Sequence, residues 1–306
     1  MSKRYVWLLP VLLIVAVYLV PTPRKTAAEL YAAPDRRPVE QLEAFRQLPI
    51  KTRVVGDQPY RYVVRGAGPQ TILFLHGMAG AYDFWWQQVA EFSRDHRVIS
   101  VTYPPVDNLA ELSRGIVGIL DAEGVPTATV VGSSLGGYLT QYLLARYPDR
   151  VERVVLGNTF PVNDIYKARN DGQIGVARWL PEWAVMAVLR QGLRKNVIPA
   201  AQHDPLAAAQ LLENTYGRMS KAQFLARYNC VINQFKPADG RQIEKPLLIM
   251  ESDNDPLILP ELRARLKAHY ATARVHTFHN KGHFPYLNDP GTYNAVLRRF
   301  LETTNP

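Results

Sequence analysis

The apolar positions from residue 51 onward fall into short runs separated by polar turns. Eight of these runs are rich in β-branched and aromatic residues, which favour strands. The runs cover residues 53–55, 60–65, 71–75, 98–102, 128–131, 154–156, 246–250 and 274–278. Several of them are apolar throughout, as strands that are buried on both faces of a sheet are.

Helical patterns lie between the later runs. They cover residues 84–93, 108–122, 135–147, 260–270 and 292–303. Strands and helices in alternation are typical of an α/β fold, with a mainly parallel sheet and helices on both of its faces. We therefore expect an eight-stranded sheet built from residues 51–160 and 246–306. The first two runs are joined without a helix and should form an antiparallel edge.

Residues 161–245 interrupt this alternation. They contain no convincing strand pattern, and a structureless loop of this length would be unusual in a compact domain. Helical patterns cover residues 175–180, 181–193, 206–216 and 221–233. The sequence therefore predicts a helical cap inserted into the α/β core.

The first 23 residues form an apolar segment with basic flanks. Residues 5–20 carry no charge, and a helix that continued to residue 23 would be about 28 Å long, close to the thickness of a bilayer core. A cleaved signal peptide would have small residues directly after the apolar run, where this chain has Leu19, Val20 and Pro21. We therefore favour an uncleaved membrane anchor over residues 5–23, and a cleaved signal is the alternative.

The membrane side is weakly specified, because basic residues lie on both sides of the apolar segment. A short N-terminal segment of this kind usually keeps its N-terminus inside. We therefore expect the following domain on the exported side, or secreted if the segment is cleaved. Residues 24–50 should form a linker with a short helix at 39–48.

Composition excludes several classes of protein. Of the 306 residues, 47% are hydrophobic and 21% are charged, which argues against a disordered chain and against a multi-span membrane protein. The 36 Lys and Arg against 27 Asp and Glu give a net charge of +9, but the basic residues are scattered, so no nucleic-acid partner is expected. A single cysteine, Cys230, excludes an internal disulfide and a cysteine-rich metal site.

The sequence GSSLGG at residues 132–137 carries the strongest chemical signal. It follows a predicted strand and opens a predicted helix, so Ser134 would occupy a strained turn with its hydroxyl exposed above the strand ends. The helix N-terminus would direct the free N–H of Leu135 at developing negative charge. Glycines that serve only the packing of a turn would give the same letters. We favour Ser134 as a nucleophile.

The sequence HGMAG at residues 76–80 follows the third predicted strand directly. A second oxyanion donor is expected from this loop, and we assign it to the backbone N–H of Met78. His76 and Gly77 should support the loop.

A serine hydroxyl needs a base, and a histidine has a suitable pKa. Of the seven histidines, His283 is the one that falls on a short glycine-flanked loop after the last predicted strand. An acid that orients this base is expected after residues 246–250, where Asp255 is our first choice and Asp253 the alternative. Both aspartates could instead serve as turn formers.

Residues 51–302 resemble the capped α/β-hydrolase superfamily. The likeness rests on HGMAG (76–80), VVGSSLGGYL (130–139) and KGHFPYLNDP (281–290). Within the superfamily the chain is most similar to the maspardin-like branch, through SSLGGYL (133–139), LGNTF (156–160), ARYNC (226–230) and FPYL (284–287). That branch has an asparagine in place of His283 and is thought to bind partners, so this sequence departs from it towards catalysis.

The resemblance implies a serine hydrolase with a helical cap. We expect a membrane-anchored enzyme that cleaves a small-molecule carboxylic ester, lipid-like or with a small acyl or aromatic group, through Ser134, His283 and Asp255, without a metal or an organic cofactor. Apolar cap residues should line its pocket or simply pack the cap on the sheet: Trp179, Trp183, Met186, Leu189 and Phe224. The alternatives are a non-catalytic protein-binding adaptor and a peptidase or amidase.

Overall fold

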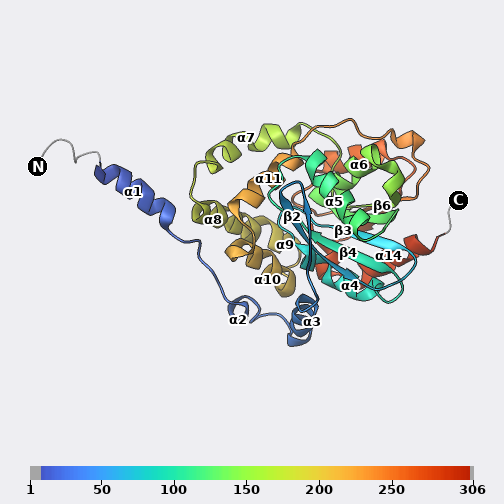
Figure 1. Ribbon diagram of the computed structural model, residues 1–306, viewed down its shortest axis with the longest axis horizontal. Coiled ribbons are helices and arrows are strands. Elements are labelled where there is room, and N and C mark those ends of the chain that lie inside the picture. Colours follow the sequence, from blue (N-terminus) through green and yellow to red (C-terminus); the bar gives the residue numbers. More distant parts are fainter. Residues whose placement is uncertain (1–7, 304–306) are drawn as a thin grey trace, which may run out of the picture.

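The computed structural model describes residues 8–303 (Figure 1). Its centre is a sheet of eight strands in the order β1-β2-β4-β3-β5-β6-β7-β8. The strands are β1 (Lys51–Val55), β2 (Gln58–Arg65), β3 (Thr71–Leu75), β4 (Arg97–Thr102), β5 (Ala128–Ser133), β6 (Val151–Gly157), β7 (Leu247–Ser252) and β8 (Arg274–Phe278). The eight-stranded sheet predicted from the apolar runs is confirmed.

The sheet is mostly parallel. β2 pairs in antiparallel fashion with β1 and with β4, whereas every other neighbouring pair is parallel. The predicted antiparallel edge is therefore confirmed. After β3 the chain adds β4 on one side and β5 on the other, so the strand order reverses around β3. Open α/β sheets place ligands outside the carboxyl ends of the strands at such a point.

Helices cover both faces of the sheet. One face carries α5 (Leu109–Ala122), α6 (Leu135–Arg146) and α12 (Pro260–His269), and the other carries α3 (Arg36–Arg46), α4 (Trp86–Phe92) and α14 (Pro290–Glu302). Successive residues of β3 serve the two faces in turn, because side chains alternate along a strand. Leu73 packs in the first core and Phe74 in the second, and both are fully buried.

The chain between β6 and β7 is helical in the structure. It contains α7 (Ile165–Ala177), α8 (Glu182–Gly192), η4 (Leu193–Val197), α9 (Ile198–Ala200), α10 (Pro205–Glu213), η5 (Asn214–Arg218), α11 (Lys221–Val231) and η6 (Gly240–Gln242). The helices α7 to α11 lie together beside the sheet in Figure 1, whereas η6 lies against the end of α12, where Gly240 approaches the backbone of His269. The prediction of a helix at 175–180 is wrong in its bounds, because α7 begins ten residues earlier and ends at Ala177; the glycines within it weaken the helical pattern.

The remaining short elements lie between the strands and the longer helices. They are η2 (Tyr82–Trp85), η3 (Pro148–Arg150) and α13 (Pro285–Asn288).

The N-terminal region differs from the prediction. The helix α1 covers 12 residues, Leu8–Leu19, and within residues 8–303 the structure contains no helix that is both long and apolar enough to cross a membrane. The expected spanning helix over residues 5–23 therefore has no support, and residues 5–7 lie outside the described part.

The segment that follows α1 packs against the body of the protein. It contains α2 (Ala27–Leu30) and α3. α3 begins at Arg36, three residues before the predicted start. Arg46, the last residue of α3, forms ion pairs with Asp83 at 2.7 Å and with Glu213 at 2.5 Å, so the segment is joined both to the core and to the cap.

Candidate active site

Ser134 occupies the turn between β5 and α6. Its backbone has φ 56° and ψ −120°, a strained conformation for a residue with a side chain. The turn is held by its neighbours: the N–H of Ser134 donates to the carbonyl of Gly157 at 2.9 Å, and the hydroxyl of Thr159 donates to the carbonyl of Ser134 at 2.6 Å. The serine is thus fixed at the carboxyl end of β5.

The glycines around Ser134 are required by close backbone approaches. A Cβ on Gly136 would lie 2.0 Å from the carbonyl oxygen of Leu75, and one on Gly132 would lie 2.2 Å from that of Gly136. A Cβ on Gly77 would lie 3.0 Å from the Cβ of Ser134. The loop at 76–80 therefore passes directly beside the serine, as the sequence suggested.

The structure places both predicted oxyanion donors near Ser134. Leu135 is the first residue of α6, where the backbone N–H groups of a helix have no partner within the helix. Met78 belongs to the loop beside Ser134 and lines the same cavity. The two backbone N–H groups come from the ends of β3 and β5, which are neighbours in the sheet.

His283 and Asp255 form a buried pair. The Nδ1 of His283 lies 2.7 Å from the Oδ2 of Asp255, and both side chains are almost completely inaccessible to solvent. The side-chain amide of Asn158 donates to the same oxygen at 2.8 Å, and the N–H of Leu257 donates to Oδ1 at 2.8 Å. The carboxylate is therefore fixed from both sides.

Asp255 is ionised in this environment. Its burial favours the neutral form, but the charge and the hydrogen bond of His283, with the hydrogen bond from Asn158, outweigh burial and lower the pKa of Asp255. An ionised Asp255 accepts the Nδ1–H of His283 and leaves the Nε2 of the ring free to accept a proton.

Asp253, the alternative acid, lies elsewhere. Its carboxylate contacts the Nδ1 of His279 at 2.8 Å and accepts the N–H of Asn280 at 2.9 Å, on an exposed part of the loop. It has no hydrogen bond to His283 among the described residues. The sequence left open which aspartate contacts His283, and the geometry gives this contact to Asp255.

His76 is a buried part of the loop at 76–80. Its Nδ1 lies 2.7 Å from the carbonyl of Gly77, and its ring stacks on Tyr103 with 3.9 Å between the ring centres. Burial and the nearby charge of Arg227 lower the pKa of His76 well below its ordinary value. His76 is therefore a neutral side chain that supports the loop.

Arg227, which sequence reasoning did not select, holds the same loop from the cap. It lies on α11 and is almost completely buried. Its Nη1 donates to the carbonyls of Met78 at 2.7 Å and Gly80 at 3.0 Å, and its Nη2 donates to that of Tyr103 at 3.3 Å. Burial lowers the pKa of Arg227 to about 10. In the sequence, the sign of this role is an arginine among the apolar residues of a predicted cap helix.

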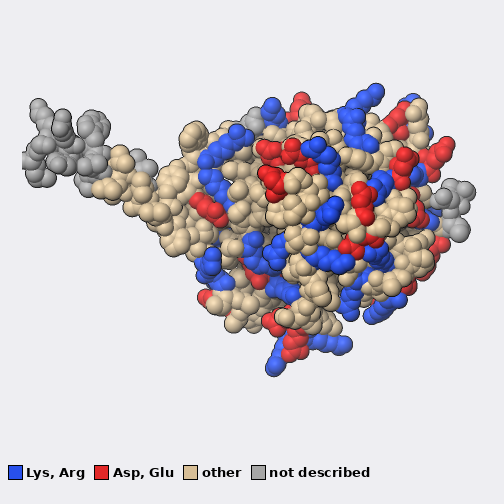
Figure 2. Space-filling model, in the orientation of Figure 1, with Lys and Arg blue, Asp and Glu red and all other residues tan. Residues whose placement is uncertain are grey.

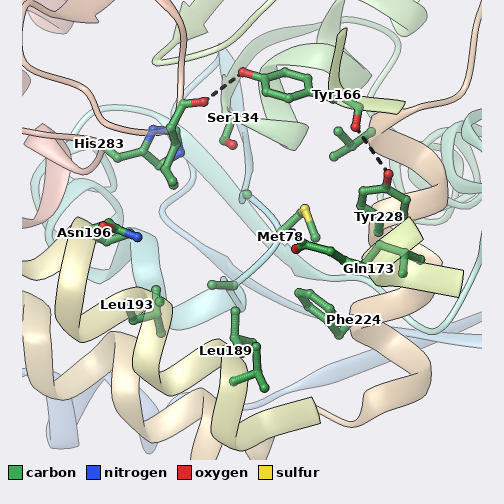
Figure 3. A pocket seen from close by; sticks show the side chains of 18 of the residues that line it. Met78, Ser134, Tyr166, Gln173, Leu189, Leu193, Asn196, Phe224, Tyr228 and His283 are labelled. Carbon is green, nitrogen blue, oxygen red and sulfur yellow. Dashed lines mark hydrogen bonds between the residues drawn. The ribbon is translucent and has the colours of Figure 1, made fainter. Parts of the chain in front are cut away.

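Ser134 and His283 both line a cavity of about 450 Å³ between the core and the cap. In Figure 3 these two residues lie at one end, and Leu189, Leu193 and Phe224 extend the wall away from them. None of the residues that line the cavity has a carboxylate, a guanidinium or an ammonium group. The hydroxyl of Tyr166 is engaged by the carbonyl of Leu257 at 2.9 Å. The cavity is therefore apolar and uncharged.

The five cap residues expected at the pocket divide between different environments. Leu189 and Phe224 line the cavity. Met186 is buried within the cap, Trp183 contacts α1, and Trp179, which lies in the turn between α7 and α8, is 80% exposed. Met186 therefore fits the alternative that these residues pack the cap, Trp183 does not line the cavity, and the expectation is wrong for the exposed Trp179.

Metal ligands are not clustered in the part of the chain that the structure describes: no three His, Cys, Asp or Glu side chains there could hold one ion. Cys230 is buried and unpaired, and burial raises the pKa of its thiol to about 12.

Comparisons with known proteins agree with this architecture. Maspardin of Danio rerio is 26% identical over 265 residues, which cover 83% of each chain. Esterase YbfF of Escherichia coli (strain K12) is 24% identical over 249 residues, which cover 75% of this chain and 92% of the esterase. The match to a further, longer relative covers 66% of that protein.

A solved structure shows the same fold. The crystal structure of a hydrolase from Pseudomonas aeruginosa PA01 superposes with a TM-score of 0.72 at 22% identity, over 83% of this chain and 98% of that one. Residues 72–296 match the model of the Alpha/beta hydrolase family. This match includes the sheet from β3 onward, the cap and all the candidate site residues, and the chain therefore belongs to the alpha/beta hydrolase family.

Proposed function

We propose that this protein is a serine hydrolase that cleaves a carboxylic ester with an apolar acyl group. The observation that carries the proposal is the buried His283–Asp255 pair, 2.7 Å apart, which shares a cavity with the strained Ser134. A protein that used this fold only for binding would not need an ionised acid behind a histidine. The similar Escherichia coli protein is named an esterase, which agrees with ester chemistry.

Acylation begins at Ser134. Its Oγ attacks the carbonyl carbon of the ester while the Nε2 of His283 takes the hydroxyl proton. Asp255 keeps the ring in the tautomer with hydrogen on Nδ1 and stabilises the imidazolium that forms. The carbonyl oxygen becomes an oxyanion, and the N–H groups of Leu135 and Met78 bind it. Each such donor contributes about 3–4 kcal/mol to transition-state stabilisation.

The tetrahedral intermediate collapses when the carbon–oxygen bond to the alcohol breaks. The imidazolium of His283 gives its proton to the departing alcohol oxygen, and the acyl group stays on Ser134 as an ester. Water then attacks this acyl-enzyme while His283 accepts one of its protons. The same proton returns to Ser134 Oγ as the carboxylic acid leaves, so the enzyme is regenerated.

The cavity supports an uncharged acyl group. Its volume of about 450 Å³ lies in the range of pockets that enclose a drug-sized ligand. A charged group would lose its hydration there without gaining a partner, which costs several kcal/mol. The side-chain amides of Gln173 and Asn196 are the remaining polar groups of the wall, besides the tyrosine hydroxyls and the two reacting residues.

Turnover of p-nitrophenyl esters by the full-length chain tests the proposal. We expect hydrolysis of acetate and octanoate esters, no hydrolysis of an ester of a dicarboxylic acid, and a loss of at least about a thousandfold in Ser134→Ala. Ser93→Ala, a serine remote from the cavity, is the matched control. A folded protein that cleaves none of these esters, and no p-nitroanilide, would instead favour a protein-binding adaptor.

A further inference from the structure

Exposed apolar side chains are concentrated at one end of the molecule. On the cap, Val176, Trp179 and Val188 are 59%, 80% and 65% exposed, and we call these three residues the cap edge. The helix α1 exposes further apolar side chains: Val11, Leu12, Leu13, Val15, Val17 and Leu19. Large exposed apolar surfaces on a folded domain usually mark sites of interaction.

The cap edge and α1 form one continuous surface. The indole N–H of Trp183 donates to the carbonyl of Val17 at 3.0 Å, and the hydroxyl of Tyr18 donates to the carbonyl of Trp179. In Figure 1 the helix α1 projects away from the body beside α8. In Figure 2 the described part of this projection carries no charged side chains, whereas the body beside it carries a few of both signs.

The cavity of the candidate active site opens at the cap edge. Val188 both lines the cavity and is 65% exposed, so it belongs to the mouth. Ala177 and Leu180 line the cavity, and they are sequence neighbours of the exposed Val176 and Trp179. An apolar chain can therefore pass from this surface into the cavity along the side chains of Val188, Ala177 and Leu180.

Cations without acidic partners border the same surface. Arg190, Arg194 and Lys195 line a shallow groove on the cap. The guanidinium of Arg190 lies 4.5 Å from the ring centre of Tyr216, and the ammonium of Lys25, in the chain that follows α1, lies 5.7 Å from it. Arg190 itself is buried, at 7% exposed, so we call the three exposed cations Lys25, Arg194 and Lys195 the basic cluster.

The basic cluster lacks carboxylate partners, whereas a neighbouring arginine has them. The nearby Arg218 forms ion pairs with Asp83 and Glu213. Arg190 instead donates to the backbone carbonyl of Thr215 at 2.8 Å, and Arg194 donates to the hydroxyl of Tyr216 at 3.0 Å. No carboxylate forms an ion pair with the basic cluster in the part of the chain that the structure describes.

We propose that α1, the cap edge and the basic cluster together dock on the surface of a bilayer that contains anionic phospholipid. The apolar side chains would enter the boundary between headgroups and acyl chains, and the three cations would contact headgroup phosphates. An exposed tryptophan is typical of residues at this depth, because its ring is apolar and its N–H is polar. Docking in this way turns the mouth of the cavity towards the lipid.

Charge complementarity favours lipid over a protein partner. An exposed apolar surface alone would fit either occupant. Three exposed cations without carboxylate partners, next to apolar helices and an apolar cavity mouth, match the layered chemistry of an anionic bilayer, with phosphate outside and hydrocarbon inside. Each basic residue near such a surface strengthens binding by about fivefold.

Flotation of the full-length chain with vesicles tests the proposal without reference to catalysis. The vesicles are phosphatidylcholine alone and phosphatidylcholine mixed with phosphatidylglycerol. The double variant Arg194→Gln with Lys195→Gln should weaken binding to the anionic vesicles by about 25-fold and leave binding to the neutral vesicles unchanged. Added salt should weaken binding of the unaltered chain to the anionic vesicles. The matched control replaces two exposed arginines of the edge hairpin, Arg53→Gln with Arg61→Gln.

A second pair of variants tests the apolar part of the surface. Val176→Ser with Trp179→Ser should weaken binding to both kinds of vesicle by at least about tenfold, because about 25 cal/mol is lost for each Å² of apolar surface no longer buried. Val54→Ser with Val275→Ser, two exposed valines on β1 and β8, is the control. Circular dichroism and thermal unfolding verify that each variant folds.

Two results would overturn the proposal. Equal binding to neutral and anionic vesicles, with no effect of the four cap substitutions, would mean that α1 alone attaches the chain to lipid. Failure to float with any vesicle, together with self-association that is lost in Val176→Ser with Trp179→Ser, would assign the surface to a second copy of the chain.

Discussion

The guanidinium of Arg227 in the cap donates a hydrogen bond to the backbone carbonyl of Met78, 2.7 Å away in the loop beside Ser134. The same Nη1 reaches the carbonyl of Gly80 at 3.0 Å. The two bonds fix the peptide groups that follow Met78 and Gly80, and they thereby hold in place the loop that carries the Met78 N–H. The cap is thus connected to the oxyanion loop as well as to the wall of the cavity.

Replacement of Arg227 should lower kcat with little change in KM. Arg227→Met removes three hydrogen bonds to backbone carbonyls, and a displaced oxyanion donor typically reduces kcat by about 10²-fold. Arg227→Lys, which keeps a donor for one carbonyl, should recover part of the loss. Steady-state kinetics on a soluble ester, with melting temperatures of both variants, provides the measurement. A loss that appears in KM alone would contradict a positioning role.

The two aspartates of the loop after β7 should behave differently. Asp255→Asn replaces the acceptor of the His283 Nδ1–H and favours the wrong tautomer, so kcat should fall by about 10⁴-fold. Asp253→Asn disturbs only the exposed contacts with His279 and Asn280 and should retain activity. The comparison uses the same ester under the same conditions. Equal losses in the two variants would argue against Asp255 as the acid.

Gly136→Ala should destabilise the protein. The new methyl group would lie 2.0 Å from the carbonyl oxygen of Leu75, and crowding of this kind typically costs about 1–3 kcal/mol in the free energy of unfolding. Gly291→Ala is the matched control, because its site on α14 is exposed and has no atom within 4 Å of the added carbon. That variant should be neutral or slightly more stable, since alanine favours helices. Urea unfolding of both variants measures the difference.

The buried His76 should contribute to the loss of stability in mild acid. Its pKa in the folded protein lies well below that of an unfolded histidine, about 6.5. Below about pH 6.5 the unfolded chain therefore binds a proton that the folded chain does not, and the free energy of unfolding falls as the pH falls. The contribution of one such group approaches 1.4 kcal/mol per pH unit.

His76→Asn isolates this contribution. The variant should be less stable at neutral pH, because the contacts with Gly77 and Tyr103 are altered, but its stability should decline less steeply between pH 6.5 and pH 5, a window set by the ordinary histidine pKa of about 6.5. Urea unfolding at several pH values gives both slopes. Parallel slopes for the two proteins would show that His76 does not carry the effect.

The fold and the segments of the site could be predicted because their signals are local. A continuously apolar strand, a glycine-rich turn and a following helix lie within about twenty residues of one another around Ser134. Such a unit has one arrangement in a parallel sheet. The order of strands along the chain then brings the loops at 76–80 and at 283 to the same end of the sheet.

The other parts of the site depend on contacts that the sequence does not encode locally. Asp253 and Asp255 occupy one loop, and only the three-dimensional course of the chain decides which of them faces His283. The contact between Arg227 and Met78 joins residues 149 positions apart. Trp179 lies in the exposed turn between α7 and α8, and the weak amphipathic patterns of the cap helices do not define where that turn falls.

Covalent labelling of the full-length chain with a fluorophosphonate probe tests the central claim most directly. Such a probe reacts with a serine only where a base activates the hydroxyl and donors bind the phosphoryl oxygen. We predict one adduct per chain, located by mass spectrometry on the peptide that contains Ser134, absent in Ser134→Ala and strongly slowed in His283→Ala. A folded chain that forms no adduct, or that carries it on a different serine, would contradict the account.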